Sequence, residues 1–180
     1  VGSQTGICVT CNNSISVDIP KLDHTPGEWI VTKEATYFDK GNRAIYCTVC
    51  NDALESQEYE LSEEEKKNWY IGACEEIPYK DIARKPNDYT GKMVKITGEV
   101  SLIIEESDKM DTPSLYYVQT KKQYGMYFED VYFVFVDTYG NDSRILEGDV
   151  ISFYGEIDGL YDWLGDKNPR LVVRYFEYID

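Results

Sequence analysis

Residues 92–104 read KMVKITGEVSLII, and this stretch decides the fold of the longer part of the chain. From Val94 to Leu102 the residues of one parity are apolar or glycine and the polar residues fall between them, while Met93 interrupts the pattern before this run. This parity is shared by Val94, Ile96, Gly98, Val100 and Leu102. Because alternate side chains of a strand point to opposite faces, the pattern predicts a half-buried β-strand. A glycine inside such a strand permits the sharp bend that a small barrel needs.

Four more strand-like runs follow this stretch. Rich in apolar and aromatic residues, they cover 115–120, 131–137, 150–157 and 171–178. Turn-forming residues separate them, at Pro113 and at 139–142, 147–149 and 167–169. Five strands at this spacing predict a five-stranded OB-fold barrel over residues 73–180.

A short helix is expected to lead into the barrel. Ser62 is followed three residues later by Glu65, which is the pattern of a capping box, and further acidic residues fill the first turn. We expect residues 61–72 to form a helical linker. A second short helix is expected from Pro78 to Arg84, ending at Pro86.

The first 60 residues contain four of the five cysteines. These form two Cys-x-x-Cys pairs, which are Cys8 with Cys11 and Cys47 with Cys50. Strand-like runs at 29–32 and 44–46 lie between the pairs, but the segment has too few large apolar residues for a core of its own. Two such pairs can hold one structural Zn²⁺ in a closed tetrahedron of four thiolates. We therefore expect a zinc-ribbon-like module over residues 1–60, and a mainly β protein overall.

Other chemistry fits the same residues. Disulfides are an alternative if the protein is exported, and iron would accept the same four thiolates. The only histidine, His24, can replace a cysteine as ligand, although we expect it to be a solvated or hydrogen-bonded loop residue.

Composition narrows the classes of partner. The formal net charge is −15, so most of the surface repels phosphate backbones and anionic membranes. No apolar run reaches the roughly 18 residues of a membrane span. Nucleic acid is therefore a disfavoured partner, and we expect no membrane insertion by this segment.

The region around the second cysteine pair resembles a repeat common in surface proteins of gut Firmicutes. The matching residues are His24, Gly27, Trp29, Val31, Thr32, Lys33, Glu34, Ala35, Thr36, Gly41, Cys47, Val49 and Cys50. Tyr37 stands where that repeat usually has cysteine. The resemblance therefore leaves Cys8 and Cys11 as the expected partners of Cys47 and Cys50.

The second half is similar to the tRNA-anticodon-like OB-fold domains of Firmicutes exported proteins and lipoproteins. The residues that carry this resemblance are 79–86, 89–92, 94–100, 145–149 and 154–160. It implies an OB fold and an exported or membrane-anchored protein, so we expect an extracellular or cell-surface location.

Recognition is a better-supported role than catalysis. No phosphate-binding loop is present, and Cys74 has no histidine near it in the sequence. Aromatic residues crowd the middle of the barrel region, and OB folds bind ligands with strand faces and loops. The candidate ligand-binding residues are Tyr116 and Tyr132, together with Tyr161 and Trp163 in the loop expected after the fourth strand. The sequence favours a non-catalytic module that binds a carbohydrate or a protein. The alternatives are a single-stranded nucleic-acid-binding protein and an enzyme that uses Cys74.

Overall fold

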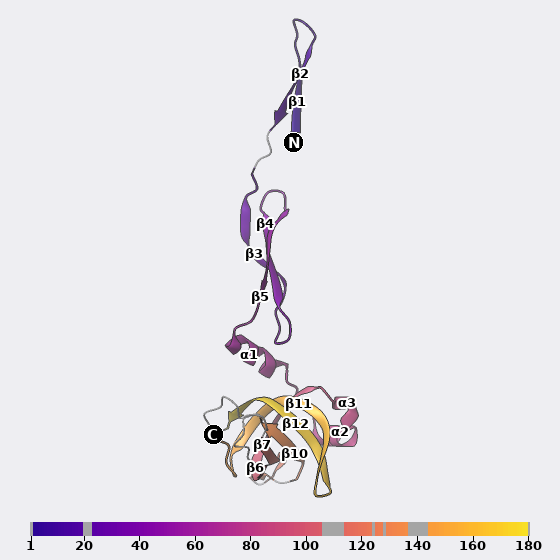
Figure 1. The fold of residues 1–180 in the computed structure, drawn as a ribbon, viewed down its shortest axis with the longest axis vertical. Helices are drawn as coiled ribbons and strands as arrows, with labels where there is room; N and C mark the ends of the chain where they lie inside the picture. Colours follow the sequence, from indigo (N-terminus) through magenta and orange to yellow (C-terminus); the bar gives the residue numbers. More distant parts are fainter. Residues whose placement is uncertain are drawn as a thin grey trace. The chain divides into compact units, whose positions relative to one another are not determined.

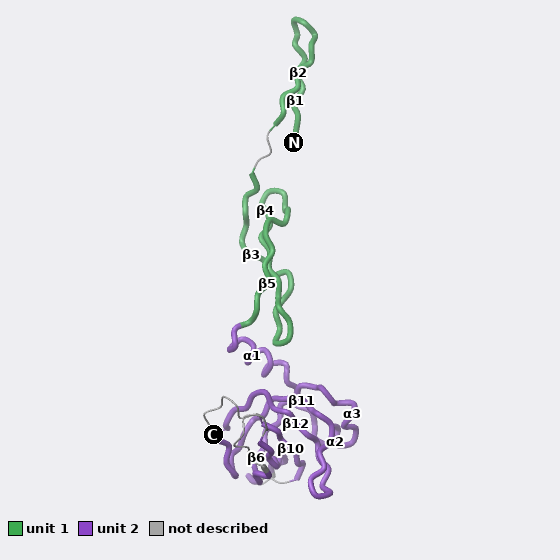
Figure 2. Tube along the Cα trace, viewed as in Figure 1, with its two compact units in different colours: residues 1–61 green, residues 62–180 purple. Residues whose placement is uncertain are grey.

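The structure is a computed structural model, and it describes residues 2–19, 23–105, 114–123, 125–127, 129–136 and 144–179. The chain divides into two compact units, Val1–Leu61 and Ser62–Asp180 (Figure 2). Both are built mainly from β-strands, as the sequence predicts.

Unit 2 is a closed five-stranded barrel (Figure 1). Its strands are β6 (Met93–Glu105), β7 (Ser114–Gln119), β10 (Val131–Val136), β11 (Val150–Trp163) and β12 (Asp166–Tyr178). They follow one another around the barrel in the order β10-β12-β11-β6-β7. All neighbours are antiparallel except β10 and β12, which are parallel and close the barrel. The five strands expected from the sequence are thus confirmed, and the barrel fits the predicted OB fold.

The barrel core explains the alternation in β6. Val94, Ile96 and Val100 are buried in it, and so is Gly98 between them. A Cβ atom on Gly98 would lie 2.5 Å from the backbone carbonyl oxygen of Gln119 on β7. The mid-strand glycine is therefore required by the close approach of the neighbouring strand.

Leu102 does not follow the predicted parity. The pairing of β6 with β7 shifts register between Val100 and Leu102, which is the mark of a β-bulge. A bulge adds one residue to one strand and so exchanges the two faces beyond it. Leu102 therefore lies on the outside, 37% exposed, and Ile103 packs against the core instead.

Strands β11 and β12 form a hairpin longer than predicted. The sequence places a loop after residue 157 and a turn at 167–169, whereas β11 continues to Trp163 and the turn lies at Leu164 and Gly165. Both turn residues have positive φ, 53° and 91°, as a two-residue hairpin turn of type I′ requires. Tyr161 and Trp163 are consequently strand residues and not loop residues.

Three helices precede the barrel. They are α1 (Glu63–Ala73), α2 (Tyr79–Arg84) and α3 (Pro86–Tyr89). The capping box at Ser62 and Glu65 is present, and α1 belongs to the barrel unit. Tyr70 of α1 is fully buried, with its hydroxyl 3.3 Å from Oε1 of Glu156 on β11. The second helix is where the sequence predicts it, and Pro86 begins a further turn of helix.

Unit 1 consists of two separate antiparallel sheets. A hairpin is formed by β1 (Gly2–Ile7) and β2 (Ser14–Ile19), and a three-stranded sheet has the order β3-β4-β5. The latter strands are β3 (Pro26–Lys33), β4 (Gly41–Cys47) and β5 (Ala53–Tyr59).

Unit 2 also contains a short antiparallel pair of strands, β8 (Lys122–Gln123) with β9 (Met126–Tyr127). The expected turn residues at 139–142 and Pro113 lie outside the described residues.

Candidate functional site

Three potential metal ligands gather at the end of the three-stranded sheet. The ligand atoms of His24, Cys47 and Cys50 all lie within 4.8 Å of one another. Sγ of Cys50 is 3.2 Å from Nδ1 of His24. Cys47 is buried, while the other two residues are exposed. This group can therefore hold a metal ion at the surface of unit 1.

The turn between β4 and β5 holds the two thiols in a knuckle. Cys47 donates its backbone N–H to the carbonyl oxygen of Asp52 at 2.8 Å and accepts from the N–H of Asn51 at 2.9 Å. Asn51 has φ of 60°, a left-handed conformation that asparagine tolerates better than most residues.

Strand β3 delivers the histidine. Pro26 lies opposite Cys47 in the β3–β4 pairing, and the N–H of Thr48 donates to the carbonyl oxygen of Thr25 at 2.9 Å. The residue just before these two, His24, is thereby placed over the knuckle. We expected His24 to be a solvated or hydrogen-bonded loop residue, with a ligand role as the alternative. It is an exposed loop residue that contacts Cys50, and the structure groups it with two thiols that could hold a metal ion.

The knuckle also favours the thiolate form of one cysteine. Backbone N–H groups of Cys50 and Val49 donate to Cys47 and lower the pKa of its thiol to about 6, and His24 adds to the effect. At Cys50 the N–H of Asp52 lowers the pKa, but burial, Cys47 and the Asp52 carboxylate outweigh it and raise the pKa. A lowered pKa prepares a thiol for metal binding, because the thiolate is the ligand.

The donor set fits zinc. Zn²⁺ binds thiolate sulfur at about 2.3 Å and imidazole nitrogen at about 2.0 Å, which puts ligand atoms of one tetrahedron roughly 3.5–3.8 Å apart. The observed separations, 3.2 Å for Cys50 to His24 and no more than 4.8 Å overall, are near these values. One nitrogen and two sulfurs leave one tetrahedral position for a further ligand.

Cys8 and Cys11 are not part of this cluster. They lie in the turn of the β1–β2 hairpin, and the group that the described residues form around Cys47 and Cys50 does not include them. The four-thiol site remains a prediction from sequence. The pKa of Cys8 is lowered to about 7 by N–H groups of Thr10 and Cys11, the same cause that acts at Cys47.

A second candidate site lies outside the barrel, where aromatic side chains cover β7 and β10. Phe133 is fully buried there, with ring centroids of Tyr117 at 5.7 Å, Tyr161 at 5.3 Å and Trp163 at 6.4 Å. All three contacts are edge-to-face, the arrangement that aromatic pairs prefer. The β11–β12 hairpin thus supplies Tyr161 and Trp163 to the outer face of the barrel.

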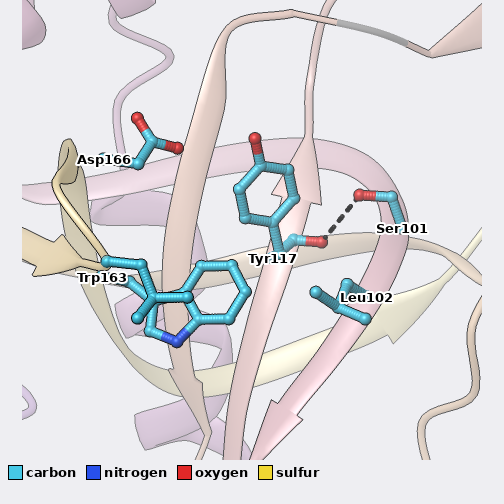
Figure 3. A pocket seen from close by; sticks show the side chains of 6 residues that line it. Ser101, Leu102, Tyr117, Trp163 and Asp166 are labelled. Carbon is cyan, nitrogen blue, oxygen red and sulfur yellow. Dashed lines mark hydrogen bonds between the residues drawn. The ribbon is translucent and has the colours of Figure 1, made fainter.

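A pocket of about 390 Å³ opens beside this cluster (Figure 3). Its lining residues come from β6, β7 and the β11–β12 hairpin, and they are Ser101, Leu102, Tyr117, Trp163, Leu164 and Asp166. The hydroxyl of Ser101 donates to the backbone carbonyl of Tyr117 at 3.2 Å. Burial and the nearby Asp166 carboxylate raise the pKa of Tyr117, so the two groups are close enough to interact. The pocket therefore combines two aromatic rings, one of them the phenol of Tyr117, with the carboxylate of Asp166.

Of the four predicted ligand-binding residues, only Trp163 lines this pocket. Tyr161 lies on β11 of the same hairpin, with its ring in contact with Phe133 and Phe135. Tyr116 and Tyr132 are each 2% exposed and belong to the barrel core, so a surface role for them is wrong. Both lie on the inward parity of their strands, and the outward residues Tyr117 and Phe133 form the outer face instead. Sequence alternation alone did not show which parity faces outward.

Cys74 follows α1 and is partly buried. Burial raises the pKa of its thiol to about 11, with a smaller contribution from Glu156. A thiol in this state is almost fully protonated at neutral pH, unlike an activated nucleophile.

Comparison with models of known protein families finds no match, and a comparison with curated proteins finds no relative. None of the helices in the described ranges has both the length and the apolar character to cross a membrane.

Proposed function

We propose that this protein is a non-catalytic binding module whose barrel pocket takes a neutral oligosaccharide. The observation that carries this proposal is the position of the pocket. In OB folds the face of the second and third strands and the loop between the fourth and fifth strands bind oligonucleotides and oligosaccharides. Here β7 supplies Tyr117, and the β11–β12 hairpin supplies Trp163 and Asp166.

The lining chemistry favours a sugar over a nucleic acid. The rings of Tyr117 and Trp163 can stack on the apolar faces of a pyranose, while Asp166 and the Tyr117 hydroxyl can bind its hydroxyl groups. The lining residues include the carboxylate of Asp166 and no basic side chain. This negative charge would repel a phosphate backbone. A cationic peptide satisfies the same charge condition and is the competing ligand.

For the β3–β4–β5 sheet, the ribbon of unit 1, we propose a structural zinc ion held by His24, Cys47 and Cys50, with a further ligand in the fourth tetrahedral position. The large apolar residues of β3, namely Trp29, Ile30 and Val31, are exposed, so the sheet has little core of its own. A bound metal would supply folding free energy that packing does not.

From the two family resemblances we propose that the protein lies outside the cell, as the ectodomain of an exported, membrane-anchored protein.

Calorimetric titration with neutral oligosaccharides of glucose, N-acetylglucosamine and mannose tests the pocket. We expect binding by at least one series, with affinity reduced at least tenfold by Trp163→Ala and several-fold by Asp166→Asn. Leu160→Ala is the matched control, because this residue lies on the same hairpin, 42% exposed and outside the pocket lining. The Asp166→Asn substitution should not disturb folding, because the Asp166 side chain is exposed. A loss of binding in this variant can therefore be assigned to the pocket and not to misfolding.

Failure to bind any of these sugars would overturn the proposal, as would binding that Trp163→Ala and Asp166→Asn leave unchanged. Binding of a lysine-rich peptide in their place would reassign the pocket to a protein partner. Salt-sensitive binding of single-stranded DNA or RNA would reassign it to nucleic acid.

A further inference from the structure

Leu164 occupies a turn position that favours a different residue. It is the first of the two residues in the β11–β12 turn, and its φ of 53° lies in the left-handed region. Turns of this type usually have asparagine, aspartate or glycine there, and a bulky side chain is uncommon at positive φ. The leucine side chain is also 90% exposed, so the fold gains little packing from it. A residue that is unfavourable for its turn and packs against little points to a role at the surface.

The surface that Leu164 helps to form is the wall of the barrel pocket. Leu164 lines the pocket from the hairpin turn, and Leu102 lines it from β6. Leu102 faces outward because of the bulge in β6, and it is 37% exposed. These two leucines and the indole of Trp163 therefore present apolar surface to a ligand in the pocket.

The polar groups of the lining are few. The hydroxyl of Ser101 donates to the backbone carbonyl of Tyr117 at 3.2 Å. The others are the Asp166 carboxylate and the Tyr117 hydroxyl, which Figure 3 shows toward one side of the pocket, with the Trp163 indole and Leu102 toward the other. Burial and the Asp166 carboxylate raise the pKa of Tyr117, so its hydroxyl keeps its proton and can donate, whereas a carboxylate accepts.

A plain hexose matches this lining poorly. Hydroxyl groups surround its ring, and each one that is buried against a leucine loses its hydrogen bond to water. An N-acetyl group instead offers one N–H donor, one carbonyl acceptor and one methyl group. The Asp166 carboxylate can accept from the N–H and the Tyr117 hydroxyl can donate to the carbonyl. Leu164, two residues from Asp166, can cover the methyl group.

We propose that the barrel pocket selects N-acetylated hexosamines over plain hexoses, with Leu164 and Leu102 as the residues that determine this specificity. The inference rests on the proposed function and names the kind of sugar that the same pocket takes. One buried methyl group and one added hydrogen bond together correspond to a preference of about tenfold or more. A free amino sugar would instead bring an ammonium group, which is costly to desolvate, against the same leucines.

Three tetrasaccharides with the same β-1,4 linkage test this preference. Tetramers of N-acetylglucosamine, glucosamine and glucose differ only at C2 of each ring. In calorimetric titration of the full chain, we expect the N-acetylated tetramer to bind at least about tenfold more tightly than the other two. Saturation-transfer NMR of the same complex should show the acetyl methyl protons among the most strongly saturated protons of the sugar.

Two substitutions remove the apolar contact without disturbing the fold. Leu164→Asn places in the turn a residue that adopts positive φ readily, so the hairpin should be at least as stable as before. Leu102→Ala shortens an outward side chain. Each should weaken binding of the N-acetylated tetramer at least about threefold, the value of one buried methyl group, and leave binding of the glucose tetramer unchanged. Leu160→Ala, on the same hairpin but outside the lining, should leave the preference intact.

The possible failures separate this inference from the proposed function. Equal binding of the N-acetylated and glucose tetramers would overturn the inference and leave sugar binding standing. So would a preference that Leu164→Asn and Leu102→Ala leave unchanged, with thermal denaturation showing both variants folded. Tighter binding of the glucosamine tetramer, lost in Asp166→Asn, would show that the pocket recognises a cation instead. Failure of all the tetramers would count against sugar binding itself.

Discussion

Sγ of Cys50 lies 3.2 Å from Nδ1 of His24, although 26 residues separate them in the chain. The β3–β4 pairing produces this contact, because it sets Pro26 opposite Cys47 and so brings the residue two positions earlier over the knuckle. The metal affinity of the ribbon should therefore depend on a residue that belongs to neither Cys-x-x-Cys pair.

Replacing His24 by alanine should weaken zinc or cobalt binding to the ribbon by at least about tenfold, since even the loss of a group that only orients a ligand typically costs 10–100-fold. A competition titration with a chromophoric chelator measures the change. Glu28→Gln, an exposed substitution on the same strand, should leave the affinity unchanged. Unaltered affinity in the His24→Ala variant would favour a site made by the four thiols alone.

Removing the metal should unfold the β3–β4–β5 sheet and leave the barrel intact. The buried residues of this sheet and its loops are small ones such as Ala35 and Ala44, so the proposed metal would supply much of its stability. Hydrogen exchange with and without a chelator should show faster exchange across residues 26–59 and no change across 150–157. Equal loss of protection in the barrel would contradict the separate stability of the two units.

Gly98→Ala should destabilise the barrel by about 1–3 kcal/mol, the usual cost of overpacking. The added Cβ atom would lie 2.5 Å from the backbone carbonyl oxygen of Gln119, which cannot move without distorting β7. Gly72→Ala in α1 is the matched control, because its Cβ atom meets nothing within 4 Å and alanine favours the helix. Chemical denaturation measures both, and equal stability of the two variants would refute the role given to Gly98.

Local patterns in the sequence predict the elements that local physics determines. The alternation from Val94 to Val100, the capping box at Ser62 and the mid-strand glycine Gly98 each depend on residues close in sequence or on backbone geometry, and all three are confirmed. The bulge at Leu102 was not predicted, since it arises from pairing with β7 and not from β6 itself.

The site was harder to predict for the same reason. Spacing identifies Cys47 and Cys50 as candidate ligands, but only the register of β3 against β4 brings His24 to them. Likewise, Tyr116 and Tyr117 look equivalent in sequence, and only closure of the barrel decides that the first is core and the second lines the pocket. The hairpin extension to Trp163 depends on a turn at Leu164–Gly165 that resembles ordinary loop sequence.

Cys74 should be the slowest of the five cysteines to react with iodoacetamide. Its pKa of about 11, against an ordinary value of 9.0, leaves about 100-fold less thiolate at neutral pH than an unperturbed cysteine has. Its alkylation rate should therefore keep rising with pH until about pH 11. The folded state holds this proton more tightly than the unfolded state, so the stability that Cys74 contributes is present below pH 9 and is lost as pH rises toward 11.

Mass spectrometry of peptides after timed alkylation measures the rate at each pH, and Cys74→Ser provides the background. In the same variant the decline in stability between pH 9 and 11 should be smaller than in the wild type, which denaturation at fixed pH values checks. Fast alkylation of Cys74 at pH 7, with the ribbon thiols protected by metal, would contradict the buried, protonated state and support an enzyme that uses this residue as its nucleophile.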